Sequence, residues 1–330
     1  MGFIDEIKTK AKADLKTIVL PETEDVRTYE AAEAILKEGT AKLVLIGSEE
    51  EVAKNKGNFD ISGAQIVDPA KSEKTESYIA KLVELRQKKG MTEEQARELL
   101  LTNYPYYGVM MVKMGDADGM VSGACHSTAD TLRPCLQILK TKPGTKLVSA
   151  FFIMVVPDCE MGENGTFVFG DCGLNQNPSP EELAAIAISS AESFKQLVGA
   201  EPRVAMLSHS SMGSAKHDDV TKVVEAVKIA KAEAPDLMLD GELQLDAAFV
   251  PSVGASKAPQ SPVAGKANVL IFPDLDAGNI GYKFVQRLAT AEAYGPMPQG
   301  IAAPVHHLSR GCSAQAIDGV VPLPAVPCQP

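Results

Sequence analysis

Short apolar runs alternate with amphipathic segments along the first part of the chain, and this alternation is typical of a parallel β-sheet covered by helices. Ala31, Ile35 and their neighbours form a one-sided apolar stripe, and Gly39 stands where a C-terminal helix cap belongs. The chain is therefore expected to begin with an α/β lobe. Its strands are predicted at residues 17–20, 42–46 and 65–67, and its helices at 25–37 and 49–56.

Residues 72–114 indicate consecutive helices, one of which begins at a capping box formed by Thr92 and Gln95. A second α/β series follows, and its first two strands are apolar enough to be buried. A stretch rich in glycine, serine and proline, residues 251–265, predicts a mobile surface loop. The strands of this series are expected at 146–156, 165–169, 203–207, 237–239 and 268–272, and the helices at 179–197, 218–232 and 277–289.

With 330 residues the chain exceeds the length at which single cores stop growing, about 250–300 residues, so two domains are expected. The residues from about Tyr294 onward are too few for a domain of their own and should return to the first lobe. We therefore predict a discontinuous first α/β domain, 1–144 plus 295–330, and a second α/β domain, 145–294. The active site is expected in the cleft between these lobes.

Charge and cysteine usage narrow the functional classes. The formal net charge of −11 disfavours nucleic acid and anionic membranes as partners, so a bound anion must meet local cations. No apolar run approaches the ~18–20 residues needed to span a bilayer. The six cysteines include no CxxC pair and the five histidines no HExxH motif, so neither a metal site nor a disulfide framework is predicted. Reduced thiols in the cytoplasm fit this pattern best.

The stretch 119–134 is the first candidate for chemistry. A strand is expected to end at Gly123, and Ser127 or Thr128 then caps a helix whose free N–H groups and hydroxyls favour phosphate. Arg133 lies on the same helix and could bind the same anion. An ordinary capped helix, with the arginine paired to a surface carboxylate, explains the pattern equally well.

Three further stretches carry polar chemistry, each with a plainer explanation. Residues 208–217 could hold phosphate but match no nucleotide motif, and a polar loop is favoured there. At the start of a helix, Gly278 and Asn279 would let a ligand approach the backbone, although a simple strand-to-helix turn with a solvated Lys283 is the alternative. Near the chain end Ser309 and Arg310 are expected at a loop apex, where Cys312 is better explained as a buried small residue than as a nucleophile.

Together these stretches resemble the phosphate acetyltransferases along nearly the full length. The residues that carry the resemblance are GVMMVKMGDADGMVSGACHSTADTLRPCLQIL at 108–139, FPDLDAGNIGYKFVQRLA at 272–289 and PQGIAAPVHHLSRGCS at 298–313. The resemblance implies acetyl-CoA + phosphate ⇌ acetyl phosphate + CoA. It also implies a two-lobed, three-layer α/β/α fold like that of isocitrate and isopropylmalate dehydrogenases. CoA enters as a substrate, without cofactor or metal, and a homodimer is expected.

In the family the CoA thiol attacks the acyl carbonyl directly, so no acyl-enzyme is implied. Carried over by motif, Arg133 and Arg310 would hold the acyl phosphate, and Ser309 would stabilise the developing negative charge. Arg86 resembles an arginine that faces CoA in the family. The remaining positions expected to contact substrate are Ser127, Thr128, Gly278, Asn279, Lys283 and Tyr294.

One departure from the family pattern concerns the base that accepts the thiol proton. The family usually has an aspartate where this chain has Ala316, and Asp318 lies about 200° further round a helix, at 3.6 residues per turn. His306 and His307 replace an Asn-Asp pair, and an imidazole with a pKa near ~6.5 suits deprotonation of a thiol. His307 or His306 is therefore one candidate base, and Asp318 is a doubtful second.

Other activities stay open on this sequence. An acyltransferase for a longer group such as butyryl would need only a larger pocket. A non-catalytic acetyl-CoA-sensing relative of the same fold is supported by Ala316, whereas the presence of Ser309, Arg310 and Arg133 favours an enzyme. A dehydrogenase is disfavoured, because no aspartate cluster for a divalent metal is evident.

Overall fold

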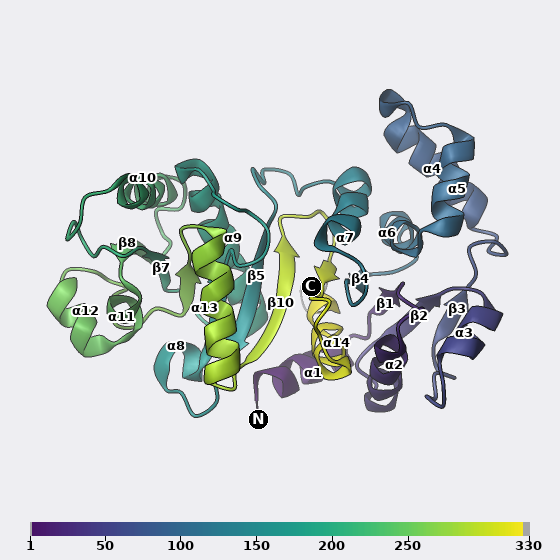
Figure 1. Ribbon diagram of the computed structural model, residues 1–330, viewed down its shortest axis with the longest axis horizontal. Helices are drawn as coiled ribbons and strands as arrows, with labels where there is room; N and C mark the ends of the chain where they lie inside the picture. Colours follow the sequence, from purple (N-terminus) through teal and green to yellow (C-terminus); the bar gives the residue numbers. More distant parts are fainter. Residues whose placement is uncertain (1, 326–330) are drawn as a thin grey trace. The chain divides into compact units, whose positions relative to one another are not determined.

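The computed structural model describes residues 2–325 and confirms the expected α/β class (Figure 1). The chain divides into two compact units, Met1–Pro143 with Ile301–Pro330 and Gly144–Gly300. The boundaries differ from the predicted ones, because Gly144 and residues 295–300 belong to the second unit. Within residues 2–325 we find no helix that combines the length and the apolar character needed to cross a membrane.

The first unit is built on five parallel strands in the order β11-β4-β1-β2-β3. β1 lies at the centre, with Ile18 paired to Leu43 on one side and to Gly119 on the other. The β11 strand arrives from the end of the chain and joins the edge beside β4. These strands are β1 (Thr17–Leu20), β2 (Lys42–Ile46), β3 (Gln65–Val67), β4 (Gly119–Ser122) and β11 (Val305–His307).

Helices of the first unit begin and end largely where local signals predict. Thr92 and Gln95 form the expected capping box, and Gly39 closes its helix in the left-handed conformation with φ 68°. Short 3₁₀ or π turns follow at 87–89, 135–139 and 323–325. The helices are α1 (Phe3–Ala13), α2 (Val26–Glu38), α3 (Glu49–Asn55), α4 (Thr75–Arg86), α5 (Glu93–Thr102), α6 (Tyr104–Met114), α7 (Thr128–Pro134) and α14 (Ala314–Val320).

The second unit has a mixed sheet in the order β10-β5-β6-β9-β7-β8. The predicted hairpin is confirmed as antiparallel β5 and β6, and the strands from β6 to β8 run parallel. β10 pairs antiparallel with β5, and this pairing keeps residues 295–300 in the second unit. The strands are β5 (Ser149–Val155), β6 (Thr166–Gly170), β7 (Val204–Leu207), β8 (Leu239–Leu243), β9 (Val269–Ile271) and β10 (Glu292–Gln299).

One expectation for the second unit is wrong: residues 251–265 are not simply a loop. Pro251 opens a helix at a position that needs no backbone N–H, and the buried Gly254 packs against the backbone of Gly265. The small residues of this stretch, from which we predicted a mobile loop, instead allow two backbone segments to pack closely. The helices of this unit are α8 (Met161–Asn164), α9 (Pro180–Val198), α10 (Asp218–Glu233), α11 (Leu245–Phe249), α12 (Pro251–Lys257) and α13 (Leu275–Leu288).

The buried histidine of β11 predicts how stability depends on pH. Burial lowers the pKa of His306 from 6.5 to about 4, and neither ring nitrogen has a hydrogen-bond partner among the described residues. Between pH 6.5 and about 4 the unfolded chain binds a proton that the folded chain excludes, so stability falls as the pH falls through this window. We therefore expect scanning calorimetry to show a smaller loss of Tm between pH 7.5 and 5 in His306→Leu than in the unmodified protein.

The matched control for this prediction is His217→Asn, because His217 is an exposed helix cap whose Nδ1 accepts from the backbone N–H of Asp219, and the asparagine side-chain oxygen can accept in its place. This variant should lose as much Tm as the unmodified protein over the same pH range. An identical loss of Tm in His306→Leu would contradict the prediction.

Candidate active site

Three neighbouring parallel strands end at one edge of the first unit's sheet. β1 lies beside β4, and β4 lies beside β11. The segments that follow them hold Glu22, residues 123–128 and residues 308–310. Ligands of open α/β sheets bind outside the carboxyl ends of the strands, so this edge is the candidate active site.

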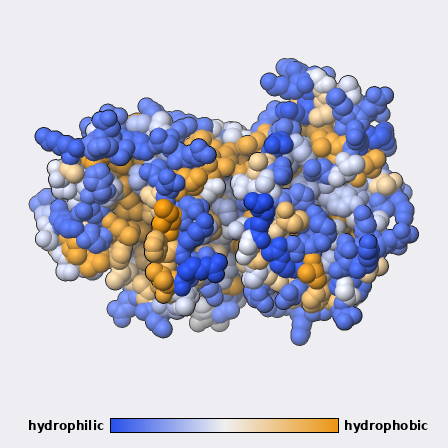
Figure 2. All heavy atoms as spheres, viewed as in Figure 1, coloured by the Kyte–Doolittle hydropathy of each residue, from blue (hydrophilic) through white to orange (hydrophobic). Residues whose placement is uncertain are grey.

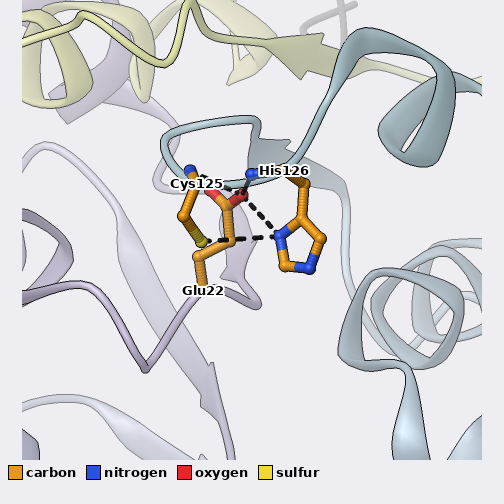
Figure 3. Close-up of side chains that lie close together, drawn as sticks. All are labelled: Glu22, Cys125 and His126. Atoms are coloured by element: carbon orange, nitrogen blue, oxygen red, sulfur yellow. Dashed lines mark hydrogen bonds and ion pairs between the residues drawn. The ribbon is translucent and has the colours of Figure 1, made fainter.

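Glu22 is a buried carboxylate, 3 % exposed, and it holds the loop that follows β4. Its oxygens accept hydrogen bonds from the backbone N–H groups of Gly123 (2.8 Å), Ala124 (2.8 Å), Cys125 (3.2 Å) and His126 (3.0 Å). His126 Nδ1 lies 2.8 Å from the same carboxylate (Figure 3). The backbone N–H groups of residues 123–126 are therefore occupied by an internal anion, whereas the helix N–H groups expected to face phosphate lie beyond them, at the start of α7.

Gly123 and His307 bring the loop after β4 against β11. Gly123 has φ +110°, and a Cβ there would lie 2.3 Å from His307 Nδ1, so only glycine fits. His307 Nε2 lies 2.9 Å from the hydroxyl of Thr128, at the start of α7. Ser127 is the N-cap of this helix and accepts from the backbone of Asp130. The structure thus brings Thr128 and His307 together, although 179 residues separate them.

Arg27 connects two of the loops at this edge, and sequence reasoning missed it. Its guanidinium donates to the carbonyl of Ala124 (2.7 Å) and to those of Cys312 (2.7 Å) and Arg310 (3.1 Å). Asp25, the N-cap of α2, pairs with Arg27 at 2.6 Å. The only local signal is an arginine two residues after a capping aspartate, and that pattern indicates nothing beyond a helix start.

His307 is a weak base in this environment. Burial lowers its pKa from 6.5 to about 4; the charge of Arg310 acts in the same direction and that of Glu22 opposes it. A free thiol has a pKa near ~8.5, so transfer of its proton to this imidazole is strongly unfavourable. The contact with Thr128 instead suits a positioning role.

The exposed residues at the edge carry the available positive charge. Ser309 and Arg310 are both exposed, and one buried residue, Leu308, separates them from β11. The Arg133 side chain is 59 % exposed and lies 3.9 Å from Asp130, so the alternative of a carboxylate partner is partly met. Because that contact is loose and solvated, Arg133 stays available to an anion.

Arg86 and Arg133 share a neighbour in Tyr106. Burial raises the pKa of the Tyr106 phenol, whereas the positive charges of Arg133 and Arg86 lower it. Both guanidiniums therefore act on the same hydroxyl, which also contacts Gln137 at 3.0 Å. Tyr106 is a further residue of this region that the sequence did not indicate.

Asp318 faces away from these residues and is engaged elsewhere. Its carboxylate accepts from Lys8 of α1 at 2.6 Å, and Lys8 also pairs with Glu38 at 2.7 Å. Ala316 lies in the first turn of α14, where its N–H donates to the Ser313 hydroxyl. The doubt about Asp318 as a catalytic base is thus supported by its contacts.

Four predicted residues lie in the second unit, where three of them have local partners. The amide of Asn279 donates to the carbonyl of Cys172 at 3.2 Å and accepts from Lys283 at 2.6 Å. The hydroxyl of Tyr294 donates to Glu292 at 2.6 Å. Gly278 packs tightly, because a Cβ there would lie 2.6 Å from the carbonyl oxygen of Asp171.

The cysteines at the sheet edge are not activated nucleophiles. Partial desolvation, followed by the charges of Glu22 and Glu24, raises the pKa of the Cys125 thiol. Burial likewise raises the pKa of the Cys312 thiol. Both thiols therefore stay protonated near neutral pH, in agreement with an activity that needs no acyl-enzyme cysteine.

Comparison with known proteins places this chain in a family. Residues 2–325 match the family model described as phosphate acetyl/butaryl transferase, so the chain belongs to this family of acyltransferases. A phosphate acetyltransferase of Acetivibrio thermocellus is 61 % identical over 329 residues, which cover 100 % of this chain and 99 % of the relative. One from Bacillus subtilis is 51 % identical and covers 93 % of each chain. The solved structure of a phosphotransacetylase from Staphylococcus aureus matches with a TM-score of 0.89 and 44 % identity, covering 99 % of this chain and 98 % of that one.

The charge of Glu22 predicts the reactivity of Cys125. Glu22→Gln removes one of the charges that raise the pKa of this thiol, so the thiolate fraction at a given pH should increase. We expect Cys125 to react several-fold faster with an aromatic disulfide reagent at pH 8, followed by absorbance. The Cys125→Ser variant identifies the part of the signal that comes from this thiol. An unchanged or slower rate in Glu22→Gln would contradict the role given to its charge.

Proposed function

We propose that this protein transfers an acetyl group reversibly between CoA and inorganic phosphate. The observation that carries this proposal is the identity of 61 % to a phosphate acetyltransferase along the whole chain. CoA, acetyl-CoA, acetyl phosphate and inorganic phosphate are then its substrates and products, and no separate cofactor is required. The described cysteines are free thiols, which a reducing cytoplasm maintains, and we place the protein there.

The reaction itself explains why cations are needed in an acidic protein. The CoA sulfur attacks the carbonyl carbon of acetyl phosphate, a C–S bond forms, and the C–O bond to phosphate breaks. We assign Arg310 and Arg133 to the phosphate and the Ser309 hydroxyl to the tetrahedral oxyanion. Removing one preorganised donor of this kind typically costs about 2.7–4 kcal/mol of barrier. Arg86 is assigned to CoA, and Thr128, positioned by His307, to the phosphate.

The thiol proton needs a destination, and the side chains near α14 do not supply a strong base. Position 316 is an alanine, Asp318 is paired with Lys8, and His307 has a pKa of about 4. We propose that the proton ends on the departing phosphate, which leaves as hydrogen phosphate, so that charge and protons balance. Proximity of the two substrates then does most of the catalytic work.

Turnover measurements test this assignment directly. We expect CoA-dependent consumption of acetyl phosphate by the unmodified protein between pH 5.5 and 9. Arg310→Lys should lower kcat/KM about 100-fold, since one donor of the phosphate site is lost. Ala316→Asp should raise kcat about tenfold or more, because a general base typically contributes ~10²–10⁴-fold.

Gln315→Asp is the matched control, since it places the same charge on an exposed neighbouring position of α14. If turnover appears only in Ala316→Asp, the chain is an impaired or acetyl-CoA-sensing relative. If Arg310→Lys is as active as the unmodified protein, the role given to Arg310 is wrong.

A longer acyl group is the second candidate, and the family description favours it because that description includes butyryl-type transfer. The comparison of kcat/KM for butyryl phosphate with that for acetyl phosphate decides between the two. We expect acetyl phosphate to be preferred, as the names of the relatives indicate.

We also propose that the protein is a homodimer that pairs through α13. Ile280, Phe284 and Leu288 are 55 %, 59 % and 76 % exposed and lie four residues apart on one face. Figure 2 shows apolar side chains gathered along this helix, with hydrophilic ones beside them. Asp276 lies in the first turn of the helix and Arg287 in the last turn. Two antiparallel copies would therefore bury the apolar stripe and place opposite charges together.

Light scattering after size-exclusion chromatography tests this interface. The double variant Phe284→Asp, Leu288→Asp should elute as a monomer, since charges would be buried in the interface. Leu245→Asp, a comparably exposed leucine on α11, is the control and should leave the dimer intact. A double variant that is still dimeric would place the interface elsewhere.

A further inference from the structure

A sulfur, a nitrogen and a carboxylate oxygen meet beside the sheet edge, at a place the proposed reaction does not use. Among residues 2–325, the side chains of Glu22, Cys125 and His126 form the one group of three whose metal-ligating atoms all lie within 4.8 Å of each other. Cys125 Sγ lies 3.5 Å from His126 Nδ1, and that nitrogen lies 2.8 Å from Glu22 Oε1 (Figure 3).

Glu24 lies beside this group but outside it, and its exposed side chain can turn to supply a fourth donor. Its Oε1 atom lies 3.2 Å from Cys125 Sγ and 3.8 Å from His126 Nε2. In a tetrahedral zinc complex, with bonds of about 2.0–2.3 Å, neighbouring ligand atoms lie roughly 3.3–3.6 Å apart. The distance from Sγ to Nδ1 already has this value, and the contact between Nδ1 and Glu22 must open by about half an ångström.

We propose that Cys125, His126, Glu22 and Glu24 bind one divalent cation of borderline softness, of the Zn²⁺ class. Thiolate and imidazole ligands select such a cation over Mg²⁺ or Ca²⁺, which prefer oxygen. The thiol proton leaves to solvent on binding. The proton on Nδ1 leaves as well, or moves to Nε2 when the ring is neutral, so that Nδ1 can coordinate.

The surroundings favour a cation in both charge and rigidity. Two carboxylates face the thiol, and the four backbone hydrogen bonds to Glu22 keep its oxygens in place before any ion arrives. Cys125 is exposed, and the His126 side chain is 29 % exposed, so an ion can enter from solvent. The site is therefore preorganised on its buried side and open on the other.

The proposed cation site lies next to residues that we assign to phosphate binding, so a bound cation should affect activity. Cys125 and His126 directly precede Ser127 and Thr128, and Arg27 holds the preceding carbonyl of Ala124. A bound ion would fix this loop and put positive charge beside the phosphate-binding residues. We therefore infer that Zn²⁺ lowers the KM for acetyl phosphate reversibly; this clause rests on the proposed function, whereas binding itself does not.

Cobalt absorption spectroscopy tests the site without any assay of activity. Co²⁺ titrated into the full chain should give the near-ultraviolet thiolate charge-transfer band and the visible bands of a tetrahedral complex, at one ion per chain. Zn²⁺ should abolish these bands by displacement. Cys125→Ser should remove the charge-transfer band, and Glu24→Gln and His126→Asn should each weaken binding about tenfold or more.

Cys159→Ser is the matched control, because it removes a thiol of the second unit and should leave the cobalt spectrum unchanged. A band that survives in Cys125→Ser, or an octahedral spectrum without thiolate character, would overturn the proposed site. Far-ultraviolet circular dichroism of each variant separates loss of binding from loss of folding. Cobalt or zinc binding with an unchanged or higher KM for acetyl phosphate would overturn only the inference on turnover, and inactivity without metal would overturn only the proposed function.

Discussion

The candidate active site depends on one buried carboxylate. Glu22 follows β1 and accepts four backbone N–H groups from the loop that follows the neighbouring strand β4. A hydrogen bond to an ionised acceptor is roughly twice as strong as a neutral one, and donors left unsatisfied in a buried loop would be costly. The conformation of this loop, and with it the start of α7, therefore depends on a residue about one hundred positions earlier in the chain.

Arg27 fixes the loop that follows β11 in a similar way. It donates to carbonyls on the loop after β4 and on the loop after β11, so that the two segments carrying Thr128 and Arg310 share one rigid cation. Its planar fork of donors can reach several carbonyls at once, which the single ammonium of lysine cannot match. The exposed residues that we assign to the substrates thus lie on loops whose backbones are already fixed, and such preorganisation is what electrostatic catalysis requires.

The charged side chains at this edge form two sets: those that hold the loops in place and those that reach solvent. Glu22 is buried and is balanced by backbone N–H groups, and the half-buried Arg27 and Asp25 balance one another, whereas Arg133 and Arg310 reach solvent. In a chain of net charge −11, the exposed arginines are the proposed source of the local positive potential that an anionic substrate needs. The carboxylates of Glu22 and Glu24 form a negative patch nearby. The proposed phosphate-binding residues and the proposed cation site are therefore neighbours.

The sequence by itself determined the α/β class, the helix caps, the hairpin of β5 and β6, and the family, because periodicity, capping residues and long motifs are local properties. It also indicated Arg133, Ser309 and Arg310. Only the tertiary structure decided that Glu22 and Arg27 organise the edge, that β10 pairs with β5, and that Lys8 engages Asp318. The physical reason is that these contacts join groups that lie roughly 100 to 310 positions apart in the chain. Such partners leave no periodicity or spacing in the sequence, and only the folded sheet brings them within hydrogen-bond distance.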